Sequence, residues 1–143
     1  VVYDFGDYNM IWEHAQSIDN GPYGRNHGIS YIGNNGTLVL DRGGWEVIPD
    51  SKRMEAVPLQ AVKGNGHDVH TANFIDVVRS RKLAELRCSI QEGAHTAIVC
   101  QMGNISYKSG DKVSWNEAAG QFNEVKANPF IKATYHNGYQ VPK

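Results

Sequence analysis

The chain has 143 residues, of which 41% are hydrophobic and 20% are charged, and its formal net charge at pH 7 is -1. This length fits one folded domain, and the near-zero net charge gives no reason to expect nucleic acid or an anionic membrane as a partner. No apolar run is long enough to span a bilayer, and the sequence does not identify a compartment beyond a slight preference for the cytoplasm over the periplasm.

Strand-forming residues dominate the first half of the chain. Apolar and aromatic residues at 1–5 and 9–15 flank Gly6-Asp7, a pattern that predicts a hairpin. A loop rich in turn formers follows at 17–28. Two more hairpins are predicted at Asn35-Gly36 and at residues 42–44, because tight hairpin turns favour residues that tolerate positive φ. We therefore expect an antiparallel meander of about five strands.

Apolar side chains fall on both faces of these expected strands. Met10 and Trp12 share one face, whereas Ile11 lies on the other, and residues 45–48 behave in the same way. A sheet with one solvated face normally shows a cleaner polar alternation. Both faces of the sheet are therefore expected to meet a partner.

The second half of the chain is expected to be helical. After a linker at 50–66, a helix is predicted from His67-Asp68 to residue 81, with Asp68 as its N-cap and an apolar stripe that includes Ile75. Ser89 and Glu92 form the S-x-x-E capping box of a second helix, which Gly110 can end. A short strand at 113–115 and an extended tail complete the chain, and Tyr135 and Tyr139 are expected to anchor that tail by packing.

These elements predict an α+β fold with a mostly antiparallel open β-sheet and two helices packed on one face. The other apolar face then needs a partner, which can be another domain, another subunit or a substrate.

Candidate binding residues gather on the second strand and in the loop that follows it. Trp12 offers a stacking surface, and His14 on the same strand face offers a group for a substrate hydroxyl. The loop adds the set Tyr23, Arg25, Asn26 and His27. Stacking rings together with planar hydrogen-bond donors suit a polyol or a carboxylate, although a structural polar network would use the same residues.

Other reactive side chains give no catalytic or metal site. His67 and His70 lack the carboxylate partner of a metal motif and are interpreted as solvated or capping histidines. Cys88 and Cys100 are expected to be buried free thiols. His95 and Cys100 lie on diverging faces of the second helix, which excludes a Cys-His pair. No phosphate-binding glycine motif or nucleophile elbow occurs.

Several short motifs together resemble one enzyme family. Residues 12–14 read W-E-H and residues 31–38 read Y-I-G-N-N-G-T-L. Residues 104–107 read N-I-S-Y, and residues 112–115 read K-V-S-W. In this order and spacing, the motifs resemble the C-terminal region of Gfo/Idh/MocA-type oxidoreductases, in particular a bacterial subgroup, and the resemblance spans nearly all of the chain.

The resemblance implies that residues 1–143 are the C-terminal α+β substrate and oligomerisation domain of a two-domain enzyme. An N-terminal Rossmann domain of the same protein would then hold NAD or NADP, and the substrate would be a sugar or a polyol. The chain contains neither a Rossmann glycine fingerprint nor an E-K-P motif. We therefore assign no catalytic, cofactor-binding or metal-binding residue, and we expect the chain alone to bind no cofactor and to be inactive. A homo-oligomer is expected, and a non-catalytic carbohydrate-binding or dimerisation module remains the alternative.

Overall fold

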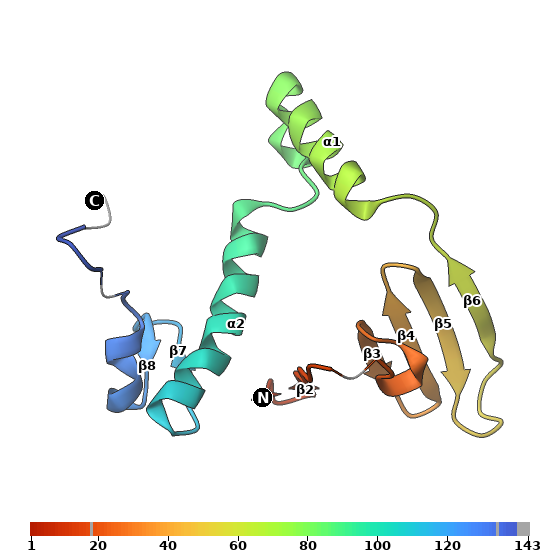
Figure 1. Ribbon diagram of the computed structural model, residues 1–143, viewed down its shortest axis with the longest axis horizontal. Helices are drawn as coiled ribbons and strands as arrows, with labels where there is room; N and C mark the ends of the chain where they lie inside the picture. Colours follow the sequence, from red (N-terminus) through yellow and green to blue (C-terminus); the bar gives the residue numbers. More distant parts are fainter. Residues whose placement is uncertain (18, 134, 140–143) are drawn as a thin grey trace. The chain divides into compact units, whose positions relative to one another are not determined.

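A computed structural model describes residues 1–17, 19–133 and 135–139 of the chain. The chain divides into two compact units, Val1–Arg87 and Cys88–Lys143. The elements of the first unit are β1 (Val2–Asp4), β2 (Asn9–Ile11), η1 (Pro22–Gly24), β3 (Ile29–Ile32), β4 (Gly36–Asp41), β5 (Gly44–Pro49), β6 (Val57–Ala61), α1 (Gly66–Ser80) and η2 (Leu83–Glu85) (Figure 1). Those of the second unit are α2 (Ile90–Ser109), β7 (Trp115–Asn116), β8 (Gln121–Phe122) and η3 (Val125–Phe130).

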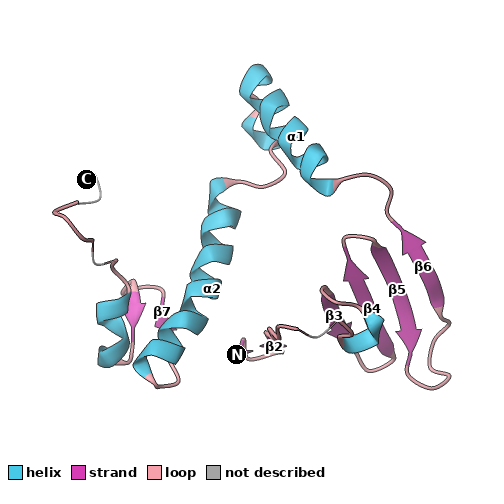
Figure 2. Ribbon diagram, in the orientation of Figure 1, coloured by secondary structure: helices cyan, strands magenta, loops and turns pink. Residues whose placement is uncertain are grey.

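The fold is α+β with mostly antiparallel sheets, as the sequence predicts (Figure 2). The three predicted hairpins are confirmed, because β1 pairs with β2, β3 with β4 and β4 with β5. The single five-stranded meander is wrong. β1 and β2 form a separate two-stranded sheet, and the larger sheet has the order β3-β4-β5-β6.

Strand β6 replaces part of the expected linker at 50–66, so that prediction is wrong as well. Residues 57–61 contain Pro58, which weakens a strand pattern because proline has no N–H for the ladder. β6 lies at an edge of the sheet, where a proline is tolerated. The strand is held by antiparallel pairing with β5, with an irregularity between Trp45 and Val47.

The register of the larger sheet separates its side chains into two faces. Cross-strand partners point to the same side, so Leu40 shares a face with its partners Ile29 and Trp45. Tyr31 is 60% exposed and Trp45 is 40% exposed. We call this side of the sheet the apolar sheet face; its members are Ile29, Tyr31, Leu38, Leu40, Trp45 and Val47. The opposite face carries the buried Val39 together with Asp41 and Glu46.

Helix α1 begins one residue earlier than predicted and has a different cap. The side chain of Asn65, not that of Asp68, accepts a hydrogen bond of 3.0 Å from the backbone N–H of His67. The Asn73 side chain binds the end of η2 and the chain that follows it, since it donates to the carbonyl of Glu85 and accepts from the N–H of Arg87. The main contact of α1 is thus with the η2 turn, and the packing of two helices on one sheet face stays a prediction.

Helix α2 is capped as predicted at both ends. The Ser89 hydroxyl accepts a hydrogen bond of 3.2 Å from the N–H of Glu92, and Gly110 ends the helix in the left-handed region with φ of 74°. Ile105 on this helix packs in a small core with Phe122 and Ala127. No helix in the described part of the chain is long and apolar enough to cross a membrane.

The C-terminal segment departs from the expected extended tail. The predicted strand at 113–115 is displaced to β7, which pairs with β8 and places the rings of Trp115 and Phe122 edge to face at 5.1 Å. The predicted anchors Tyr135 and Tyr139 are exposed, and the end of the predicted tail, residues 140–143, lies outside the described residues. The apolar signal of residues 121–130 belongs instead to β8 and to η3, whose Ala127 is fully buried.

The cysteine prediction is confirmed for the free thiols and wrong for their burial. Cys88 and Cys100 are both free, as expected, but both are exposed. Cys88 lies before the N-cap residue of α2 and is therefore outside the helix. Cys100 lies on a different face of α2 from the buried Ile105.

Two glycines of α2 provide a matched test of this helix. Gly93 has nothing within 4 Å of a Cβ built on it, and it lies in the helix interior, where alanine is favoured over glycine. Gly110 has equally open surroundings but a φ of 74°, which strains any residue with a Cβ. We predict that Gly93→Ala stabilises α2 by about 0.5–1 kcal/mol and that Gly110→Ala destabilises it by about 1 kcal/mol. Urea unfolding followed by circular dichroism measures both changes, and effects of the same sign would contradict the assignment of the cap.

Candidate functional site

The loop between the two sheets of the first unit lies close to the end of β4. Gly28 has φ of 148°, and a Cβ at this position would come within 2.5 Å of the carbonyl oxygen of Leu40. Only glycine permits this approach without a shift of the backbone. Before it, the turn η1 places Tyr23 in the left-handed region with φ of 60°. The chain between them, including Arg25, is therefore held near β4.

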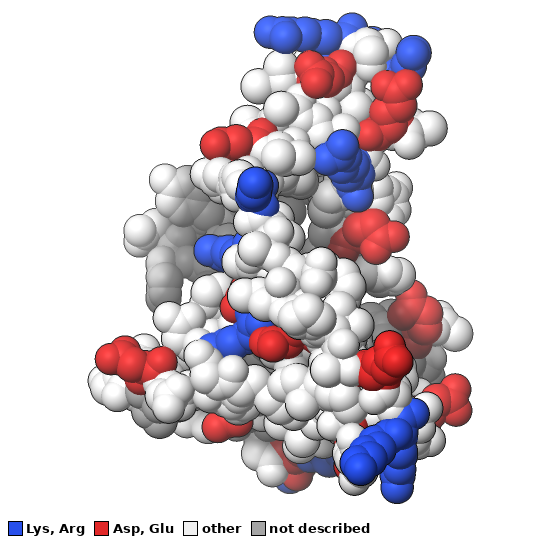
Figure 3. Space-filling model, turned by 90° about the vertical axis from the view of Figure 1, so that its right-hand side faces the viewer, with Lys and Arg blue, Asp and Glu red and all other residues white. Residues whose placement is uncertain are grey.

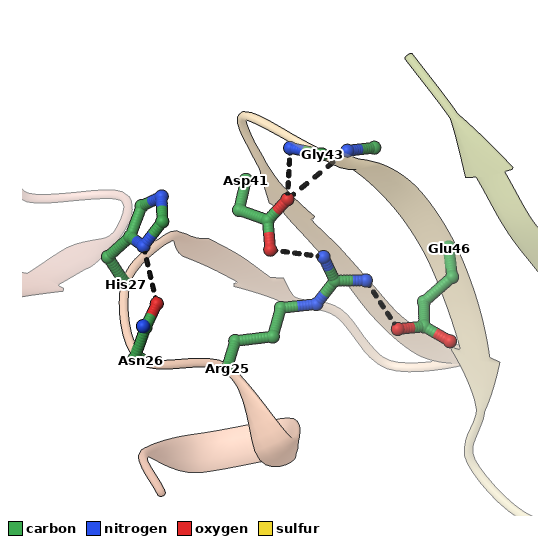
Figure 4. Close-up of polar contacts among 7 residues, drawn as sticks. Arg25, Asn26, His27, Asp41, Gly43 and Glu46 are labelled. Carbon is green, nitrogen blue, oxygen red and sulfur yellow. Dashed lines mark hydrogen bonds and ion pairs between the residues drawn. The ribbon is translucent and has the colours of Figure 1, made fainter. Parts of the chain in front are cut away.

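Arg25 joins this loop to the sheet through two ion pairs. Its Nη1 donates to Oδ2 of Asp41 at 2.5 Å, and its Nη2 donates to Oε1 of Glu46 at 2.6 Å (Figure 4). The side chains of Arg25 and Asp41 are only 13% and 16% exposed. We call this arrangement the Arg25 clamp; it consists of Arg25, Asp41 and Glu46.

The backbone of the β4–β5 turn fixes the first carboxylate of the clamp. Oδ1 of Asp41 accepts hydrogen bonds from the N–H of Gly43 at 2.6 Å and of Gly44 at 3.1 Å. The hydrogen bond from Arg25 and then that from Gly43 lower the pKa of Asp41 below its ordinary value. The hydrogen bonds to Glu46 and Asp41 raise the pKa of Arg25. Both shifts favour the charged forms of Asp41 and Arg25 at neutral pH.

A shallow polar hollow of about 430 Å³ lies beside the clamp. Its lining combines carboxylates, an aromatic ring, an amide and one aliphatic side chain: Asp19, Tyr23, Gly24, Arg25, Asn26, Asp41, Glu46 and Leu59. Within the described part of the chain, Nε of Arg25 is the one buried side-chain nitrogen or oxygen without a hydrogen-bond partner. Because this atom has almost no accessible surface, its missing hydrogen bond is a cost of forming the clamp and not a contact point for a ligand.

The structure brings together only part of the predicted set of binding residues. Tyr23, Arg25 and Asn26 line the hollow. His27 lies next to them in the chain, and its Nδ1 is 2.6 Å from Oδ1 of Asn26 (Figure 4). The outlying members, Trp12 and His14, do not line the hollow.

Trp12 continues the first hairpin instead. The backbone N–H of Trp12 donates to the carbonyl of Val1, and Trp12 is 61% exposed. Because β1 and β2 pair only with each other, the face that Trp12 and His14 were expected to share is not a face of the larger sheet.

Sequence reasoning missed the residues that the sheet contributes to the hollow. Asp41 and Glu46 lie on the strands β4 and β5, and Leu59 lies on β6. The sequence of the β4–β5 hairpin could have indicated Asp41 and Glu46. A turn that pairs Asp41 with Gly44 also pairs Val39 with Glu46. This register places both carboxylates on the same sheet face as the buried Val39. Charged side chains are unexpected on a face that buries apolar residues, so they indicate a special role.

The described residues contain no group of three or more histidines, cysteines or acids that could hold a metal ion. His67 and His70 are exposed, in agreement with their interpretation as solvated side chains. Acidic and basic side chains are interspersed on the face shown in Figure 3, which fits the near-zero net charge of the chain.

The second unit has an apolar groove of about 230 Å³ along α2. Its lining includes Ile98 and Met102 of the helix, with Trp115 and Ile131 from the segments that follow. The groove offers van der Waals contact but few polar groups that could orient a substrate. The hollow beside the Arg25 clamp is therefore the stronger candidate for a binding site.

Comparisons of the chain with models of protein families, with curated proteins and with solved structures find no match. The geometry of the hollow and the motifs of the sequence therefore carry the functional argument.

The Arg25 clamp predicts an acid-sensitive contribution to stability. Because Arg25 depresses the pKa of Asp41 in the folded chain, the ion pair stabilises the fold fully above the unfolded pKa of about 3.9. This stabilisation is lost as the pH falls through the lower folded pKa. In Arg25→Met the pKa of Asp41 should rise, and in Arg25→Lys it should be intermediate, because one ammonium cannot span two carboxylates as a guanidinium does.

Carboxyl NMR titration of Asp41 measures this change directly. The control is Arg79→Met, a substitution on α1 that removes the same charge outside the clamp. An Asp41 pKa that is equal in the unchanged chain and in Arg25→Met would contradict the clamp.

Proposed function

We propose that this chain is the substrate-facing α+β domain of an NAD(P)-dependent oxidoreductase of the Gfo/Idh/MocA type that acts on a sugar or a polyol. The observation that carries the proposal is the hollow beside the Arg25 clamp, which offers fixed carboxylate acceptors next to the ring of Tyr23. The motifs at 12–14, 31–38, 104–107 and 112–115 support the family.

The composition of the hollow suits a polyhydroxylated molecule. Carboxylates such as Glu46 accept hydrogen bonds from hydroxyl groups, and Asn26 can both donate and accept. Tyr23 and Leu59 add apolar contact for the C–H groups of a sugar ring. The carboxylates are held by Arg25 and by the turn after β4, so their positions are set before a ligand binds.

In this proposal the domain shapes the substrate pocket, and the cofactor and the hydride-transfer groups belong to an N-terminal Rossmann domain of the same protein. Gly64 and Gly66 stand at the start of α1, but residue 69 is a valine, so the described residues contain no complete G-x-G-x-x-G fingerprint at the start of a helix. The chain then contributes substrate recognition, and NAD or NADP acts only when the partner domain is present.

The apolar sheet face supports the second part of the proposal, a role in oligomer formation. Tyr31 and Trp45 are exposed there beside the half-buried Leu38 and Leu40. Contiguous exposed apolar groups of this kind mark interaction surfaces. The same face favours the alternative function, a non-catalytic carbohydrate-binding or dimerisation module.

The enzyme proposal makes a prediction about the cofactor. The 143-residue chain should bind neither NAD(H) nor NADP(H) in a calorimetric titration, and the coding sequence upstream of Val1 should encode G-x-G-x-x-G after a strand. Tight binding of either cofactor by the chain alone would contradict the assignment of the cofactor site to a separate Rossmann domain. A start or stop codon directly before Val1 would overturn the enzyme proposal and leave the binding module.

The oligomer proposal makes a prediction about self-association. Light scattering of the chain at high concentration should detect a dimer or a larger species. Tyr31→Lys should abolish it, because a lysine in the centre of an apolar interface is costly to desolvate. Ile32→Lys is the matched control, since Ile32 is the next residue of β3, is exposed, and points to the opposite face. Equal behaviour of the two variants, or a strict monomer before substitution, would contradict the assigned interface.

A further inference from the structure

We infer that the hollow beside the Arg25 clamp accepts uncharged or cationic polyols, including amino sugars, and rejects sugar acids and other anionic ligands. This inference rests on the proposed function, because it assigns a substrate class to the hollow. The sequence of the loop is compatible with either a polyol or a carboxylate as ligand. The inference selects the polyol.

Arg25 is not free to act as an anion receptor. An arginine that binds a ligand carboxylate presents two parallel N–H donors to it. In this structure Nη1 and Nη2 already bind different carboxylates, at 2.5 Å from Asp41 and at 2.6 Å from Glu46. A ligand carboxylate could take this place only by displacing one of them. The displaced carboxylate would then remain in a partly buried position without its counter-charge.

The charges that line the hollow are predominantly negative. Asp19, Asp41 and Glu46 carry three negative charges, and Arg25 carries one positive charge, which leaves two uncompensated negative charges. Arg42 follows Asp41 in the turn but does not line the hollow. At about 6 Å in water, each uncompensated charge weakens the binding of an anion about threefold, and salt reduces this effect.

Hydroxyl groups match the remaining hydrogen-bonding groups better than an anion does. A hydroxyl can donate to a carboxylate oxygen of Glu46 or Asp19 and can also accept from the side-chain amide of Asn26. A ligand carboxylate can only accept, so it would leave the acceptors of the hollow without donors. An ammonium group on a sugar adds donors and a favourable charge.

Three monosaccharide probes of similar size test the inference: glucose, glucosamine and glucuronate. The 143-residue chain is titrated with each at the same ionic strength and at slightly acid pH, where the amine of glucosamine is protonated. The amide signals of Tyr23 and Asn26 are followed by NMR. We expect glucose and glucosamine to shift these signals and glucuronate to bind about three- to tenfold more weakly than glucose, or not at all.

Two variants assign the selectivity to the hollow. Asp19→Asn removes one lining charge and leaves the clamp intact, so it should narrow the difference between glucose and glucuronate about threefold. Asp76→Asn makes the same change of charge on α1 and should leave the difference unaltered.

The outcomes separate this inference from the proposed function. Glucuronate that binds as tightly as glucose would overturn the inference and leave the carbohydrate site standing. An equal effect of Asp19→Asn and Asp76→Asn would show that only the overall charge matters, which also overturns the inference. Failure of all three probes to shift the signals of the hollow would overturn the carbohydrate site itself.

Discussion

The ion pairs of Arg25 are the constraint on which the candidate site depends. The register of β4 and β5 places Asp41 and Glu46 on one face of the sheet, where two carboxylates would repel each other without a cation between them. Arg25 supplies that cation from a loop 16 residues before Asp41 in the chain. The same contact closes the loop onto the sheet and creates the hollow. The position of the hollow and the placement of two of its carboxylates thus depend on one guanidinium.

The elements with strong local signals could be predicted from the sequence. The β3–β4 hairpin forms at Asn35-Gly36, although neither residue has the positive φ on which its prediction was based. The caps at Ser89 and Gly110 satisfy backbone groups of α2 as expected. Weak or ambiguous signals failed. Strand β6 was not predicted because it contains Pro58. Asn65, and not Asp68, is the N-cap of α1, because its side chain accepts a hydrogen bond from the N–H of His67.

The candidate site was predictable in part of its loop, where Asp19 was missed, and not in its sheet. Tyr23, Arg25 and Asn26 could be found as a cluster of polar and aromatic groups among turn formers. Trp12 and His14 were included because they share a strand face beside the loop, but that strand belongs to a separate two-stranded sheet and neither residue lines the hollow. Asp41 and Glu46 are distant in sequence from the loop, and only the strand register brings them to Arg25.

The central claim is that a polyol binds beside Arg25. Its most direct test is a map of amide chemical-shift changes over the whole chain at saturating inositol, a neutral polyol. We expect the largest changes at the loop residues Tyr23 to Asn26, at Asp41 and Glu46, and at Leu59 on β6. Changes centred on Trp12 and His14, or no change at any of these positions, would contradict it.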